Sequence, residues 1–171
     1  IMGGEFSIKS SDDGISSGAH IVIKDGKFSI QKSDKCITAI GNISIEGGEF
    51  TLSPTAIKSG TESGSGHGIT VKKASSGKRI GNVAISGGSI NITNCYEGIQ
   101  GVNIDISGGT IIISSLDDAL NASSGSSASG FGGRPGFPAQ NPDGQSGVNG
   151  LSISGGFLMA AAQGDGLDSN G

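Results

Sequence analysis

The sequence predicts an all-β parallel β-helix, a solenoid in which each repeat contributes three short strands. The first observation is a Gly-Gly-x-apolar-x-apolar phrase that recurs about every 21 residues. Its copies start at Gly3, Asp25, Gly47, Gly66, Gly87, Gly108 and Gly155. The second observation is that most periods carry two further apolar phrases, and the third is that no segment shows a helical apolar stripe. Repeats of this length are typical of solenoids, and these copies predict about seven stacked rungs.

Each expected strand follows from alternating apolar residues. The first phrase of a repeat directly follows the Gly pair, as in EFSI, EFTL, SINI and TIII. The second is expected to centre on Ile15, Ile37, Ile57, Ile80, Ile99, Leu120 and Leu167. The third is expected at residues 20–23, 42–45, 82–85, 103–106 and 151–153. A constant offset from each repeat start predicts an inward stack of Ile8, Ile30, Leu52, Val71, Ile92 and Ile113.

The chain length indicates one domain over residues 1–171. The repeat from Gly47 lacks a recognisable third strand. The repeat from Gly108 carries a Gly-, Ser- and Pro-rich insertion at about residues 123–148. A segment of this kind is expected to leave the solenoid as a long surface loop or as a flap over a neighbouring site. Both ends of the sequence fall inside a repeat, so we expect a fragment of a longer chain.

Composition narrows the function classes. Residues 1–79 hold ten of the eleven Lys and Arg residues and eight acids, whereas residues 80–171 hold only Arg134 and seven acids. This polarity argues against nucleic acid, which requires an unbroken basic face. No apolar run reaches the roughly 18 residues of a membrane-spanning helix. Cys36 and Cys95 are expected to be buried and too far apart for a disulfide. His20 and His67 are expected to be turn residues, and the chain is expected to be monomeric.

An acidic ladder is the chemical feature of the repeat. Aligned on the second strand, Glu97, Asp118 and Asp165 stack on successive rungs, and a smaller cluster forms in the first repeats. Carboxylates about 4.8 Å apart repel by roughly 3–4 kcal/mol at an effective dielectric constant near 20, so a cation is expected between them. Oxygen donors without His or Cys favour calcium over zinc. The predicted calcium ligands are Glu97, Asp117, Asp118, Asn121, Asp165, Asp168 and Asn170, with Asp12, Asp13 and Asp34 in the smaller cluster.

The phrases SLDDALNAS, SGFGGRPGF, LSISGG and GDGLDSNG, in residues 115–171, resemble the clostridial surface carbohydrate-binding β-helix family. The resemblance covers nearly the whole chain and is most specific in residues 108–171. It implies a right-handed parallel β-helix with bound calcium, an extracellular or cell-surface location, and binding of acidic pectin-type polysaccharide, with cellulose as a further candidate. It also implies similarity to calcium-dependent pectate lyases of β-helix fold. The Asp-Asp and Gly-Asp-Gly phrases would then be calcium ligands.

Three functions compete at this point. A non-catalytic binding module would use calcium and basic residues to hold uronate carboxylates. The basic residues expected in this role are Lys9, Lys32, Lys35, Lys72, Lys73, Lys78 and Arg79. A polysaccharide lyase would need a base close to the metal, with Lys78, Arg79 or Lys35 as candidates. We expect no catalytic residue, because the large acidic cluster contains no Lys in its own rungs. A structural spacer or adhesin stiffened by calcium is the third possibility.

Overall fold

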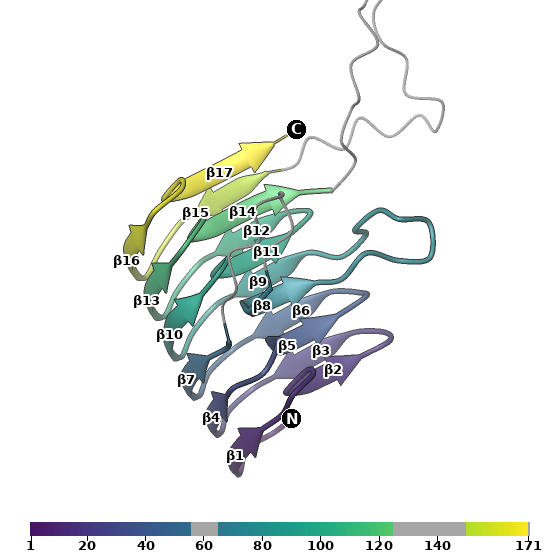
Figure 1. The fold of residues 1–171 in the computed structure, drawn as a ribbon. Coiled ribbons are helices and arrows are strands. Elements are labelled where there is room, and N and C mark those ends of the chain that lie inside the picture. The colour runs from purple at the N-terminus through teal and green to yellow at the C-terminus, as the bar shows by residue number, and fades with distance from the viewer. Residues whose placement is uncertain (56–64, 125–149, 171) are drawn as a thin grey trace, which may run out of the picture.

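The computed structural model describes residues 1–55, 65–124 and 150–170, and shows a β-helix of stacked rungs (Figure 1). Seventeen strands form three parallel sheets in the described part of the chain. The first sheet contains β1 (Glu5–Lys9), β4 (Lys27–Gln31), β7 (Glu49–Ser53), β10 (Ser89–Cys95), β13 (Thr110–Ser115) and β16 (Phe157–Ala162). The second contains β2 (Ile15–Ser17), β5 (Lys35–Ala39), β8 (His67–Val71), β11 (Ile99–Gly101), β14 (Leu120–Ser123) and β17 (Leu167–Asn170). The third contains β3 (Ile21–Ile23), β6 (Ile43–Ile45), β9 (Val83–Ile85), β12 (Ile104–Ile106) and β15 (Leu151–Ile153).

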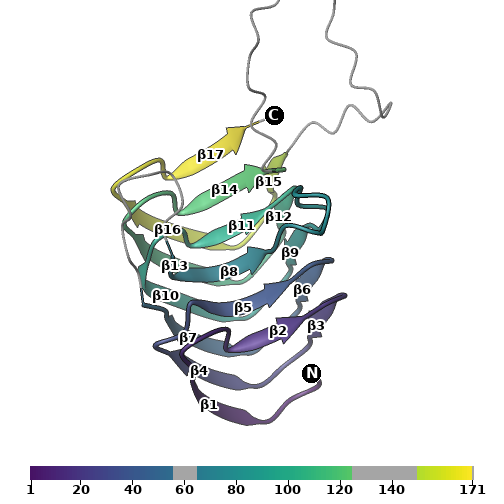
Figure 2. The ribbon, with the colours of Figure 1, turned by 45° about the vertical axis from the view of Figure 1, so that its right-hand side comes forward.

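Each of the first five rungs therefore consists of one strand from every sheet, the sixth rung contributes β16 and β17, and each strand pairs with its equivalent in the next rung. The two termini lie at opposite ends of the stack (Figure 2). The predicted parallel β-helix with three strands per rung is confirmed. Among the described residues, no helix is long and apolar enough to cross a membrane.

The Gly pairs form the corners that precede the first sheet. The second glycine of the pair takes a positive φ, as at Gly88 (92°) and Gly109 (90°), a conformation that a side chain disfavours. Close stacking imposes a second requirement, since a Cβ on Gly109 would lie 2.9 Å from the Gly88 carbonyl oxygen. The repeated Gly-Gly phrase is thus explained by a corner whose backbone has positive φ and packs closely against the neighbouring rung.

The core is a set of aliphatic and aromatic columns inside the three sheets. The register pairs Ile8 with Ile30, Ile30 with Leu52, Leu52 with Ile92 and Ile92 with Ile113. Phe6, Phe28 and Phe50 stack face to face, with ring centroids 4.8 and 4.7 Å apart. The predicted inward stack is confirmed at five of its six positions: Ile8, Ile30, Leu52, Ile92 and Ile113.

The sixth position, Val71, belongs to a different sheet. The phrase GHGITV forms β8, in which Ile69 pairs with Ile37 and Ile99, and Val71 pairs with Ala39. It is the second strand of the third rung, and the first sheet therefore has six strands where the repeat count predicted about seven rungs. The prediction was wrong here because the interval in sequence between β7 and β8 is longer than between the first and second strands of the other rungs, while Gly followed by alternating apolar residues suits either strand.

This shift corrects two further assignments. The third rung does have a third strand, because β9 pairs with both β6 and β12. Ile80, expected in the core column of the second sheet, is 63% exposed beside the antiparallel bridge between Lys73 and Arg79. The other expected member, Ile57, and nearly all of the predicted insertion at 123–148 lie outside the described residues. Cys36 and Cys95 are buried free thiols, and burial raises their pKa to about 11 and about 12.

Candidate functional site: a charged ladder on the second sheet

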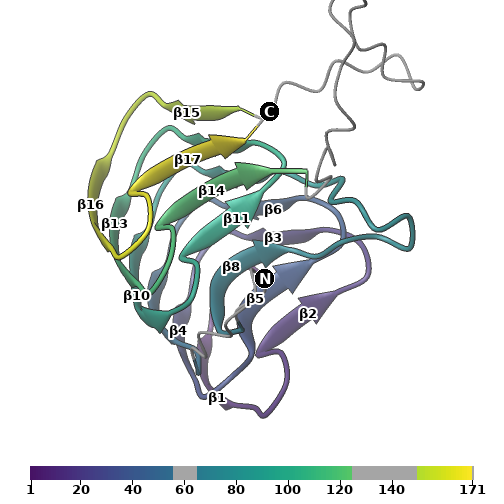
Figure 3. The same ribbon diagram turned by 45° about the horizontal axis from the view of Figure 1, so that its top comes forward.

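One column of titratable side chains runs along the edge of the second sheet where its strands begin. The register places one member on each rung, two residues before the core aliphatic. We call this column the charged ladder, and it consists of Asp13, Lys35, His67, Glu97, Asp118 and Asp165. Backbone hydrogen bonds join its rungs, for example from Gly68 N to the Glu97 carbonyl and from Gly98 N to the Asp118 carbonyl. Figure 3 shows the strands of this sheet side by side from β2 to β17.

A small residue follows each ladder position because the next rung lies directly against it. A Cβ on Gly98 would come within 2.5 Å of the Ala119 carbonyl oxygen and 2.6 Å of Ile113 Cγ2. The local sequence is thus a titratable residue, a small residue and an aliphatic residue. Read in this way, His67-Gly68-Ile69 matches Asp13-Gly14-Ile15 and Glu97-Gly98-Ile99, a signal that would have placed His67 on the ladder.

The ladder begins with a mixed end, where two lysines compensate the acids. Lys35 Nζ contacts the Asp34 carboxylate and lies 3.9 Å from Asp13 Oδ1, and Lys72 Nζ contacts Asp13 Oδ2. The pKa of Asp34 lies below its ordinary value, because burial raises it but the hydrogen bond and charge of Lys35 lower it by more. Within the described ranges, Asp12, Asp13 and Asp34 form the one group of three or more possible metal-binding side chains with ligand atoms within 4.8 Å of one another.

The middle of the ladder consists of His67, which is half-buried, and Glu97, which is buried. His67 Nδ1 lies 3.2 Å from Glu97 Oε2, and both side chains are largely enclosed. The imidazole also meets Tyr96 edge to face, with ring centroids 6.0 Å apart. The prediction that His67 is a turn residue was wrong, since it occupies the rung between Lys35 and Glu97.

Arg79 joins this middle section from outside the ladder. Its guanidinium donates to the Val71 carbonyl at 3.0 Å and to Gln100 Oε1 at 2.5 Å, and Thr70 Oγ1 donates to the same Gln100 oxygen at 3.0 Å. Burial lowers the pKa of Arg79, and the nearby Glu97 carboxylate offsets part of this change. These hydrogen bonds hold the Arg79 guanidinium between the mixed end of the ladder and its acidic end.

The upper part of the ladder is acidic, and its side chains are joined by hydrogen bonds. Asn121 Nδ2 donates to Glu97 Oε1 at 3.0 Å and to Asp118 Oδ2 at 3.1 Å, and the Asp165 amide donates to Asp118 Oδ1 at 2.8 Å. The pKa of Asp118 is raised, first by burial and then by the charges of Asp117, Asp168 and Glu97, which outweigh the Asp165 hydrogen bond.

Two buried oxygens in this acidic end have no hydrogen-bond partner among the described residues. Glu97 and Asn121 are 7% and 9% exposed. Asn121 Oδ1 is buried without a hydrogen-bond partner in the part of the chain that the structure describes, and Glu97 Oε2 meets only His67 at 3.2 Å. Buried acceptors of this kind are costly unless something satisfies them.

The predicted residues thus divide into those that the fold gathers and those that it separates. Glu97, Asp118, Asn121, Asp165 and Asp168 lie on three neighbouring rungs, with Asp117 directly before Asp118. The side chain of Asn170 lies outside the described residues, although its backbone ends β17. Lys78 does not lie on the ladder below Glu97 as expected, because it is exposed in the segment between Lys73 and Arg79. Lys9 ends β1 and Lys32 follows β4, and both are exposed.

Comparison with known proteins bears on the ligand class. Residues 1–60 match the model of a family described as carbohydrate-binding domain-containing protein. The match spans the two complete rungs from β1 to β6 and continues past β7, about a third of the chain. It supports a carbohydrate-binding role. No curated protein matches the chain, and no solved structure does.

Proposed function

We propose that this chain binds acidic plant polysaccharide of the polygalacturonate type outside the cell, with calcium, and does not cleave it. The observation that carries the proposal is the charged ladder, which crosses all six rungs of the second sheet and changes along its length from acids paired with lysines to a purely acidic section. A ladder of this length offers a polymer repeated contacts along the solenoid axis. The family match over residues 1–60 supports carbohydrate as the ligand class.

Calcium fits the donors of the acidic end. The ligands would be carboxylate and amide oxygens of Glu97, Asp117, Asp118, Asn121, Asp165 and Asp168, with Asn170 as a further candidate. Calcium accepts such oxygens in flexible geometry. The buried Asn121 Oδ1 and the raised pKa of Asp118 support a cation there. When bound, calcium would neutralise these carboxylates and bridge them to uronate carboxylates of the polymer.

A second calcium position at Asp12, Asp13 and Asp34 fits less well. Its carboxylate oxygens lie close together. However, Lys35 and Lys72 already contact Asp13 and Asp34, so a metal ion would compete with two ammonium groups. At this end the lysines themselves would meet the anionic sugar, with Lys9 and Lys73 as exposed neighbours.

Binding to polygalacturonate should be weak per contact and depend on salt. An exposed Lys–carboxylate pair contributes under about 1 kcal/mol, so replacing both Lys9 and Lys73 by Gln should weaken affinity by up to about thirtyfold. Replacing Lys24 and Lys27 by Gln removes the same charge elsewhere, from exposed pairs with Glu46 and Glu49, and should leave affinity unchanged. Affinity electrophoresis with polygalacturonate at several salt concentrations measures both. Equal losses in the two double variants would reject a localised binding face.

A lyase is the second candidate, because Arg79 is a half-buried cation with a lowered pKa next to the acidic end. Its guanidinium donors already bind Val71 and Gln100, however, so it is held as a structural cation in this arrangement. Absorbance of unsaturated uronate products distinguishes the two functions. Steady product formation by the wild-type chain that disappears in Arg79→Lys would establish the lyase.

A further inference from the structure

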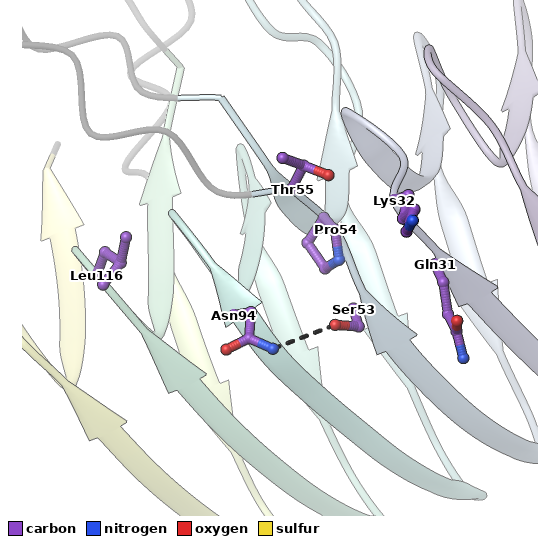
Figure 4. A pocket seen from close by; sticks show the side chains of 7 residues that line it. All are labelled: Gln31, Lys32, Ser53, Pro54, Thr55, Asn94 and Leu116. Carbon is purple, nitrogen blue, oxygen red and sulfur yellow. Dashed lines mark hydrogen bonds between the residues drawn. The ribbon is translucent and has the colours of Figure 1, made fainter.

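A groove of about 630 Å³ lies at the corner between the first and second sheets, apart from the charged ladder (Figure 4). Four successive rungs line it, with Gln31 and Lys32 from the second rung, Ser53, Pro54 and Thr55 from the third, Asn94 from the fourth and Leu116 from the fifth. Three steps between rungs span about 14 Å, so the groove is longer than one sugar ring. Its volume falls within the usual range of small-molecule sites.

The chemistry of the lining is graded along this length. Lys32 is the one charged side chain in the lining. It lies at the end of the groove formed by the second rung, which also carries Lys35 of the ladder. Amide and hydroxyl groups of Gln31, Ser53 and Asn94 follow, and Asn94 Nδ2 donates to Ser53 Oγ at 3.3 Å. Leu116, which is half-buried, adds apolar surface. A cation, hydrogen-bonding groups and an apolar surface together match a sugar that carries a carboxylate.

The backbone supports a role for the side chains of Lys32 and Asn94. They have φ of 60° and 56°, and among the described residues they are the only non-glycine residues with positive φ. Elsewhere the chain uses glycine for this conformation, as at Gly48, Gly88 and Gly109. Left-handed backbone at a residue with a Cβ costs free energy and clusters at functional sites. Both side chains line the groove, so the two unfavourable backbone conformations coincide with it.

We infer that this corner groove is a subsite for one acidic sugar unit of the polymer, with its carboxylate at Lys32 and its hydroxyls at Ser53 and Asn94. The inference rests on the proposed function and names where the chain would distinguish a uronate from its ester. The neighbouring sugar unit would lie with its apolar face on Leu116. Lys32 lies three residues before Lys35 in the chain, so the groove and the ladder share the second rung.

Affinity for two polymers tests the subsite: polygalacturonate and its methyl ester, which lacks the negative charge. Lys32→Gln should bind polygalacturonate about fivefold more weakly than the wild type, and should bind the ester equally well. Asn94→Gly should weaken binding of both polymers. Lys24→Gln removes one exposed positive charge far from the groove, and Asn91→Gly changes an exposed Asn of the same strand β10. Both controls should retain wild-type affinity.

Thermal melting provides a second measurement, which distinguishes a binding role of Lys32 and Asn94 from a purely structural one. Lys32→Gly and Asn94→Gly relieve a left-handed backbone, so their melting temperatures should equal or exceed that of the wild type while affinity falls. Asn91→Gly lies in regular strand and should melt lower. Unchanged affinity for both polymers in Lys32→Gln and Asn94→Gly would overturn the subsite and leave the proposed function intact. Failure of the wild type to bind either polymer would overturn both.

Discussion

Replacing Ile92 by Ala should lower the free energy of unfolding by about 2–5 kcal/mol. Ile92 is fully buried in β10, between Leu52 and Ile113 in adjacent rungs. Its side chain also packs over the second sheet, since a Cβ on Gly68 would come within 2.6 Å of Ile92 Cγ2. Truncation therefore leaves a cavity shared by two sheets that hydrogen-bonded rungs prevent from closing. Urea denaturation followed by circular dichroism measures the loss.

Ile80→Ala is the matched control, because the repeat pattern placed Ile80 in a core column and the structure exposes it. Its loss of stability should stay within about 0.5 kcal/mol. Equal losses for the two variants would contradict the assignment of β8 to the second sheet. Unchanged stability in Ile92→Ala would contradict the core stack itself.

The fold could be predicted from the sequence because the same local requirement recurs in every rung. The Gly pair and the alternating residues around Ile30, Leu52 and Ile113 report a left-handed corner and an inward face without any long-range information. The prediction failed where the period changes length, at residues 54–66. Beyond that point, alternation alone does not tell whether His67–Val71 is a first or a second strand, since both have one buried face.

The candidate site shows the same division. The stacking of Glu97, Asp118 and Asp165 lies where the period is regular, and it follows from the alignment. The contact of Lys72 with Asp13 joins residues 59 positions apart across the irregular corner, and it requires the three-dimensional register. The pairing of His67 with Glu97 depends on the same register. The corner groove was invisible for a different reason, since positive φ at Lys32 and Asn94 has no sequence signal as strong as glycine.

Chelation of calcium should lower the melting temperature of the wild-type chain by about 5–11 °C relative to saturating calcium. A ligand at 100 times its dissociation constant stabilises the fold by about 2.7 kcal/mol, and each kcal/mol shifts the melting temperature of a chain of this size by about 2–4 °C. The physical reason is the repulsion among Glu97, Asp117, Asp118 and Asp168, which raises the pKa of Asp118 together with burial. Differential scanning fluorimetry with and without chelator, together with elemental analysis, provides the measurement.

The pH dependence has a defined sign. The folded-state pKa of Asp118 is raised, so protonation of this carboxyl favours the fold. Its stabilising contribution is fully present below the unfolded-state value near 4, and it disappears as the pH rises through the raised folded-state pKa. In chelator, the part of the stability that depends on Asp118 should therefore decrease from acidic to neutral pH. Calcium binds the ionised carboxylates and should reverse this decrease near neutral pH.

Asp118→Asn separates repulsion from calcium binding. Asn keeps an oxygen that accepts the Asp165 amide, but it loses the charge and the hydrogen bond from Asn121 Nδ2. The variant should therefore respond little to calcium and, in chelator, lose the decrease of stability from acidic to neutral pH. Asp105→Asn makes the same change at an exposed position on β12, away from the ladder, and should retain the full response to calcium. Identical melting curves for the wild type with and without calcium, with no metal in the purified protein, would reject the calcium site. A calcium response retained in Asp118→Asn would instead move the ion to the other acidic group, at Asp12, Asp13 and Asp34.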